Sequence, residues 1–247
     1  MDIVVTGAIA FLLAGFVKGV LGFGFPIIAL VVLTLTIGLL DALAIIIVPT
    51  LATNVWQALS GIHLRAVVKR MWLYFLVAAV CVLATSQYLA STNVNWLTGL
   101  LGAVLFFFAL SRLFDIHITV PRNKEPVLSV ILGAFNGALT GLTGSFMVPS
   151  VLYMQALGFS KDMLVQAMGL FFAISTLMLS FSLASNDLID LEEVRISALA
   201  LVPSFIGVYL GRWTRDRIDE ASFQKIFLIS VLTLGAYLVW RSGVVLA

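Results

Sequence analysis

Two glycine-rich stretches interrupt an otherwise apolar chain: Gly15-Phe-Val-Lys-Gly-Val-Leu-Gly-Phe-Gly-Phe-Pro26 near its start, and Gly137-Ala-Leu-Thr-Gly-Leu-Thr-Gly-Ser-Phe-Met-Val-Pro149 just past its middle. A shift of 122 positions places three glycines of the first stretch on three of the second, and it brings Pro26 within one position of Pro149. This spacing indicates a duplicated chain. Helices broken at matching places in two halves are typical of the binding sites of membrane carriers, because irregular backbone at membrane depth needs protein or a wet cavity around it.

The composition predicts a membrane protein. Apolar residues make up 62% of the chain and charged residues 11%, about half the charged share of a soluble domain. The net charge of +2 is too small to indicate a nucleic-acid partner, and two histidines with one cysteine leave little material for a metal site. We therefore expect an all-α polytopic membrane protein with the lipid bilayer around it and no cofactor.

Ten apolar segments follow one another, five in each half. They cover residues 3–17, 26–40, 42–60, 71–90 and 95–113, and then 126–142, 146–159, 163–183, 194–211 and 223–241. Because about 20 helical residues cross the hydrocarbon core, the last three segments of each set can cross, whereas the first two are short. We interpret each short pair as two broken helices, re-entrant or discontinuous, that dip toward the midplane and return to the same side.

Lys and Arg favour cytoplasmic loops and so predict the orientation. The basic residues gather after the third segment, in the central linker and in the penultimate loop, as Arg65, Lys69, Arg70, Arg112, Arg122, Lys124, Arg212, Arg215, Arg217 and Lys225. The loop over residues 91–95 is uncharged and the loop over residues 185–195 is acidic, so we expect both outside.

Three crossings per half then put both termini outside and give the halves opposite topologies. We predict a first transmembrane repeat over residues 1–115, a cytoplasmic linker over 116–125 and a second repeat over 126–247. Inverted repeats of this kind are the architecture of many alternating-access carriers. An equivalent description counts each short pair as one helix-like element, which gives eight spans and the same loops.

The two motifs resemble those of the sulfite exporter TauE/SafE family of membrane permeases. Gly19-Val-Leu-Gly22-Phe-Gly24-Phe-Pro26 is similar to the first family motif, and Gly141-Leu-Thr-Gly144-Ser-Phe-Met-Val-Pro149 is similar to the second, both with fewer glycines than many members have. The resemblance covers nearly the whole chain. It implies transport of sulfur-containing or organic anions such as sulfite, thiosulfate or organosulfonates, usually outward across a bacterial inner membrane.

The physical chemistry of the breaks favours anions independently. A half-helix that starts inside the membrane presents unpaired N–H groups and the positive end of its dipole. Glycine allows the backbone to turn tightly and to approach a ligand. At the predicted midplane site the glycines are Gly19, Gly22, Gly24, Gly141 and Gly144.

Lys18 is the one charge that we cannot place at a membrane boundary. A lysine near the bilayer centre costs on the order of 3 kcal/mol, so it indicates a functional site that contacts or compensates the anion. The alternative is that the first segment is short enough for Lys18 to snorkel to the interface or to cap its helix. The shift of 122 positions places the neutral Thr140 opposite it.

Polar residues add a weaker signal, since several share one helix face. The positions Thr50, Asn54, Gln57 and Gly61 have offsets of 0, 4, 7 and 11, and Gln166, Ala173, Thr176 and Ser180 have offsets of 0, 7, 10 and 14. From these faces and from the second break we assign to the substrate path Asn54, Gln57, Asn136, Thr140, Thr143, Ser145, Gln166 and Thr176. The alternative is helix packing, or satisfaction of backbone groups that the break sets free.

The leading functional class is a secondary carrier that works by alternating access, and an anion-selective channel is the alternative. An enzyme is disfavoured, because the predicted spans contain no Ser/His/Asp set and no carboxylate pair. No phosphate-binding loop is present, so ATP is not a direct energy source. Uniport of an anion down its gradient is the mode of energy coupling that needs the fewest assumptions. A homodimer is possible.

Overall fold

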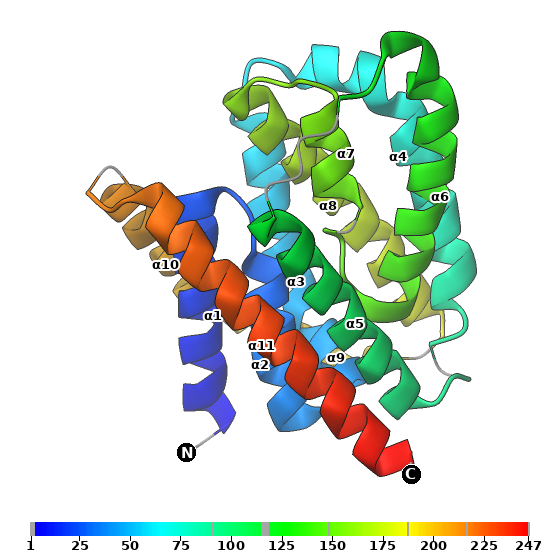
Figure 1. Ribbon diagram of the computed structural model, residues 1–247. Coiled ribbons are helices and arrows are strands. Elements are labelled where there is room, and N and C mark those ends of the chain that lie inside the picture. The colour runs from blue at the N-terminus through cyan, green and yellow to red at the C-terminus, as the bar shows by residue number, and fades with distance from the viewer. Residues whose placement is uncertain are drawn as a thin grey trace. The chain divides into compact units, whose positions relative to one another are not determined.

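The computed structural model describes residues 3–89, 91–114, 119–147, 149–186, 188–215 and 217–246 (Figure 1). Residues 116–118 of the predicted linker and residue 187 of the predicted acidic loop lie outside these ranges. Within them all regular structure is helical. The helices are α1 (Ile3–Leu21), α2 (Phe25–Ile37), α3 (Leu39–Leu59), α4 (Leu64–Ser86), α5 (Val94–Leu113), the 3-10 turn η1 (Arg122–Lys124), α6 (Glu125–Thr143), α7 (Ser150–Ala156), α8 (Lys161–Ser185), α9 (Leu191–Leu199), α10 (Leu201–Arg215) and α11 (Glu220–Leu246).

Seven helical stretches in the described residues are long and apolar enough to cross a membrane. Six of them correspond to the segments that we expected to cross: Leu39–Leu59, Leu64–Ser86, Val94–Leu113, Lys161–Ser185, Leu191–Arg215 and Ala221–Gly243. The seventh, Arg122–Thr143, covers the predicted short segment 126–142 and is longer than predicted. Lengths and compositions of this kind are those of an integral multi-pass membrane protein.

The chain forms two compact units, and each takes helices from both halves of the sequence. Unit 1 consists of Met1–Thr50, Asn93–Phe114 and Asp187–Ala247, and unit 2 consists of Leu51–Thr92 and Asp115–Asn186. Unit 1 therefore contains α1, α2, α5, α9, α10 and α11, and unit 2 contains α4, α6, α7 and α8. Helix α3 is divided between the units after Thr50.

Glycines bring helices of unit 1 into backbone contact. A Cβ atom at each of four glycines on α1 and α10 would overlap a carbonyl oxygen of the other helix. The pairs are Gly15 with Ser204, Gly19 with Val208, Gly207 with Leu12 and Gly211 with Phe16. Helices α5 and α11 also lie side by side (Figure 1), with Gly102 and Gly235 at their contact. Small residues at such contacts let membrane helices gain dispersion energy at close range.

Unit 2 uses the same device between α4 and α6. Gly133, Gly137 and Gly141 follow one another at intervals of one turn, and they face the carbonyl oxygens of Tyr74, Ala78 and Val82 in the same order. Two glycines of the second glycine-rich stretch thus pack against a neighbouring helix. Because these contacts advance along α4 and α6 in the same direction, the two helices run parallel.

An ion pair fixes the start of these two helices. The Arg70 guanidinium donates to both carboxylate oxygens of Glu125, at 3.0 and 2.6 Å, and also to the carbonyl oxygen of Leu157 at 3.0 Å. The fork geometry of arginine suits this bidentate contact. Glu125 is the first residue of α6, so the pair joins the N-terminal end of α6 to α4.

We predict that Gly15→Ala lowers the melting temperature of the purified protein, because its methyl group would overlap the Ser204 carbonyl oxygen. Overpacking of this kind costs about 1–3 kcal/mol. Gly7→Ala on the same helix is the matched control, since a Cβ there meets no described atom within 4 Å. Thermal unfolding in detergent measures both variants. A melting temperature of Gly15→Ala equal to that of Gly7→Ala would contradict the close contact between α1 and α10.

Candidate functional site

The first break, in unit 1, separates α1 from α2 by three residues, Gly22, Phe23 and Gly24. Gly22 has a φ of 81° and Gly24 a φ of 96°, a left-handed conformation that residues with side chains rarely adopt. Pro26 then lies in the first turn of α2, where its missing N–H costs nothing. The order glycine, glycine, proline therefore explains why one helix stops here and another starts.

Lys18 lies in the last turn of α1 and is only 5% exposed. A side chain that snorkelled along the outside of the helix would be exposed, so this burial argues against the snorkelling alternative. The next residue, Gly19, packs against the backbone of α10, and a Cβ there would lie 2.8 Å from the amide nitrogen of Arg212. Unit 1 thus brings a buried lysine to the basic end of α10.

The second break, in unit 2, lies between the end of α6 and the start of α7. Gly144 ends α6 in the left-handed conformation, with a φ of 69°. Side chains then bind the irregular backbone: Thr140 Oγ1 donates to Ser145 O (3.0 Å), Asn136 Nδ2 donates to Phe146 O (3.4 Å), Ser150 Oγ donates to Phe146 O, and Ser145 N donates to Thr143 Oγ1 (3.2 Å). Three residues of the predicted substrate path therefore support freed backbone groups in this structure.

Ser145 differs from its neighbours. It is 2% exposed, and its hydroxyl has no hydrogen-bond partner among the residues that the structure describes. A buried hydroxyl without a partner costs about 1–3 kcal/mol, so such a group calls for an explanation. The second break therefore contains an unused donor beside two side chains, Asn136 and Thr140, that are themselves fully buried.

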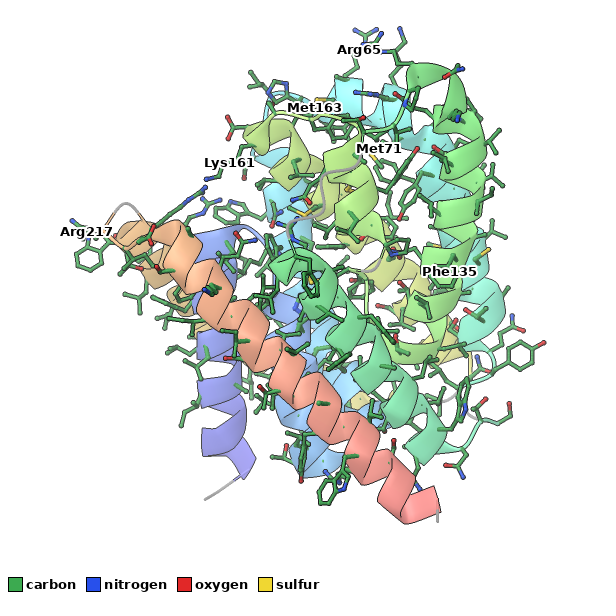
Figure 2. All side chains as sticks on the ribbon, in the orientation of Figure 1. Arg65, Met71, Phe135, Lys161, Met163 and Arg217 are labelled. Atoms are coloured by element: carbon green, nitrogen blue, oxygen red, sulfur yellow. The ribbon has the colours of Figure 1, made fainter. Side chains whose placement is uncertain are left out.

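Asn136 faces the inside of unit 2, whereas its neighbour in sequence faces outward. Phe135, which Figure 2 labels on α6, is 55% exposed. The polar face of α6 contains more than the break residues. Ser129, Gly133, Asn136 and Thr140 have offsets of 0, 4, 7 and 11, which places them on one side of the helix.

The glutamines of the predicted path hold α3 and α8 together in unit 2. Gln57 Nε2 donates to the carbonyl oxygen of Val165 at 2.7 Å. Gln166 Nε2 donates to the carbonyl oxygens of Ala58 and Gly61, at 2.6 and 2.9 Å, and its Oε1 accepts the N–H of His63 at 2.8 Å. The amide of Gln166 is therefore fully used in closing the turn after α3. This observation favours the packing alternative for that residue.

The other residues of the predicted substrate path are divided between the two units. Thr176 Oγ1 donates to the carbonyl oxygen of Phe172 in its own helix, and Asn54 is fully buried in unit 2. Unit 1 holds Lys18, Gly19, Gly22 and Gly24, and unit 2 holds the other ten predicted residues. Within unit 2, Asn136, Thr140, Thr143 and Ser145 come together at the break, and Gln57 and Gln166 each bind backbone groups of the other's helix.

Unit 2 contains a second polar group that the sequence pattern alone did not reveal. Tyr74 is fully buried, its hydroxyl has no partner among the described residues, and its ring stacks on that of Tyr153 at 5.3 Å between centroids. The Tyr153 hydroxyl lies 2.8 Å from Ser129 Oγ and donates to the carbonyl oxygen of Glu125 at 3.1 Å. The spacing of Ser129 from Asn136 along α6 was the signal that could have pointed to this group.

Comparison with known proteins identifies one family. The sulfite exporter TauE/SafE family matches residues 7–238, which is nearly the whole chain. No curated protein matches the chain, and no solved structure matches it. The match includes both glycine-rich stretches. It also covers, wholly or in large part, each described helix that is long and apolar enough to cross a membrane. The chain belongs to the sulfite exporter TauE/SafE family.

Proposed function

We propose that this protein is a secondary transporter that exports small sulfur-containing or organic anions, such as sulfite, thiosulfate or organosulfonates, across a bacterial inner membrane. The family indicates a membrane transporter of sulfur anions. The proposal adds that the two helix breaks are the anion-binding elements, that they are exposed alternately to the two sides, and that both termini face outward. The observation that carries the proposal is the buried and unused hydroxyl of Ser145 at the second break.

An oxyanion that leaves water must replace the hydrogen bonds of its hydration shell. Hydrogen bonds to charged groups contribute about 1.5–3 kcal/mol, more than those between neutral groups. The Ser145 hydroxyl can supply one without breaking an existing bond. The Asn136 amide can supply another at small cost, because its present bond of 3.4 Å is longer than the usual range of about 2.7–3.2 Å.

Lys18 gives the first break a positive charge, whereas the second break has hydroxyl and amide donors. The Lys18 side chain is 5% exposed, and a lysine at membrane depth indicates a functional site, so we place the bound anion near its ammonium group. The shift that superimposes the two motifs aligns Lys18 with Thr140, so the charge is present on one side only. A single positive charge suits a monoanion such as hydrogen sulfite or an organosulfonate.

The helix contacts support inverted repeats within this proposal. Helix α1 is the first helix of the first half and packs through glycines on α10 of the second half. Helix α6 is the first helix of the second half and packs through glycines on α4 of the first half. Each broken helix thus has the corresponding partner from the other repeat. We propose this exchange as the structural form of the repeats over residues 1–115 and 126–247.

We predict that a sulfur oxyanion raises the melting temperature of the wild-type protein and that Lys18→Met abolishes this increase. A ligand that binds only the folded state stabilises it by about 2.7 kcal/mol at a hundredfold excess over Kd. Methionine keeps the apolar stem of Lys18 and removes the charge. Thermal unfolding with sulfite, thiosulfate, sulfoacetate, taurine, acetate and sulfate measures the effect, each variant being compared with its own ligand-free sample.

One sulfur oxyanion alone should raise the melting temperature, and this increase should persist in Lys18→Arg. That result would support recognition of the anion by a positive charge at the first break. An equal increase in melting temperature in the wild-type protein and in Lys18→Met would contradict a role for Lys18 in binding. The absence of any increase with all six anions would contradict the proposed substrate class at the concentrations tested.

We predict that Ser145→Ala weakens binding of the same anion by about tenfold or more, the size expected for a hydrogen bond to a charged group. The ligand-free protein should be as stable as wild type or more stable, because the substitution removes a buried hydroxyl that has no partner among the described residues. Isothermal titration measures the affinity. Ser111→Ala in α5 is the control, since the Ser111 hydroxyl donates to Phe108 within its own helix. An unchanged affinity in Ser145→Ala would remove the second break from the site.

A further inference from the structure

Helix α3 contains a proline, Pro49, in its interior. Proline has no backbone N–H, so the carbonyl group four residues earlier, that of Ile45, loses its partner in the helix. In hydrocarbon no water replaces that partner, and an unpaired carbonyl there is costly. A proline in a membrane helix is therefore tolerated where another group donates to the freed carbonyl.

Ser197 of α9 supplies this donor. Its hydroxyl donates to the carbonyl oxygen of Ile45 at 2.6 Å and accepts the N–H of Val48 at 3.1 Å. The side chain is fully buried, and its own helix starts with a capping box between Asp190 and Glu193. One serine, about 150 residues away in the sequence, thus replaces the hydrogen bond that Pro49 cannot make.

The proline also marks the place where α3 passes from one unit to the other. Unit 1 includes α3 up to Thr50, and unit 2 includes it from Leu51 onward. The other three boundaries, at Thr92–Asn93, Phe114–Asp115 and Asn186–Asp187, come after the ends of α4, α5 and α8. Among the helices that the structure describes, α3 is the one that the unit boundary divides.

We propose that α3 bends at Pro49 during transport and that Ser197 is the positioning residue that makes this bending possible. A hydroxyl that accepts from one backbone group and donates to another can reorient as the helix angle changes. The Ile45 carbonyl then keeps a donor throughout, and the part of α3 in unit 2 changes direction relative to the part in unit 1. The inference rests on the proposed transport function, because alternating access is the process that would use the bend.

A double-mutant cycle tests the link between the two residues. Ser197→Ala removes the donor, whereas Pro49→Ala restores the N–H that Ile45 lacks. We expect Ser197→Ala to lower the melting temperature in the wild-type background and to lower it less in the Pro49→Ala background, where only the bond from the Val48 N–H is lost. Equal effects of Ser197→Ala in both backgrounds would overturn the assignment, since Ser197 would then act independently of the proline.

Transport kinetics separate positioning from simple stability. Uptake of labelled sulfite into proteoliposomes, measured over a range of concentrations, should show a turnover about tenfold lower in Pro49→Ala with KM little changed. Ser197→Ala should also reduce turnover, and Ser197→Thr should restore it because threonine keeps the hydroxyl. Normal turnover in Pro49→Ala, which should be as stable as wild type, would overturn the role of the bend.

A spectroscopic measurement tests the bend without any substrate. Asp41 and Leu59 are exposed positions at opposite ends of α3, about 27 Å apart in a straight helix. Spin labels at Asp41→Cys and Leu59→Cys, in a Cys81→Ala background, report this distance by pulsed EPR. We expect a broad distribution in the parent protein and a narrow, longer one when Pro49→Ala is added. Identical distance distributions in the parent protein and in Pro49→Ala would overturn the proposal. If α3 bends but the protein transports none of the six anions, the proposed function alone is refuted.

Discussion

The hydrocarbon core of a bilayer contains no water to pair with backbone N–H and C=O groups, so a protein must repair every interruption of a membrane helix itself. This structure shows three such repairs. Thr140 and Asn136 bind the carbonyl groups of the second break, Gln166 closes the end of α3, and Ser197 replaces the bond that a proline removes. Ser145 stands apart because its hydroxyl repairs nothing among the described residues, and for this reason it is the strongest candidate for a ligand contact.

Glycine has two separate uses in the same short motifs. Gly22, Gly24 and Gly144 have positive φ values and allow the chain to leave one helix and start another. Gly19 and Gly141 instead lie against neighbouring helices, α10 and α4, where a side chain would not fit. The first use shapes the proposed binding elements, and the second attaches each broken helix to its unit. Together these uses explain why the motifs need several closely spaced glycines.

The sequence predicted what depends on local composition and spacing. Apolar runs predicted the helices that can cross, and the two glycine stretches pointed to the places where α1 and α6 end. It could not predict contacts between distant segments, such as those of Ser197 with Ile45, because a serine in an apolar helix looks the same whether it repairs a proline or packs. For the same reason Gln166 was assigned to the substrate path, although its amide is used by α3. The crossing stretch Arg122–Thr143 was underestimated because it includes the turn η1 and Glu125, which are charged and precede the apolar run.

The central claim is that the protein carries anions by exposing binding elements alternately to two sides, and counterflow tests it most directly. Proteoliposomes are loaded with unlabelled sulfite and diluted into a trace of labelled sulfite. A carrier that alternates returns to the outside mainly with cargo, so labelled sulfite should accumulate transiently above its external concentration. Liposomes without protein show the background. Uptake that only approaches equilibrium would contradict the account and identify a channel, and no uptake above background would exclude sulfite as the substrate.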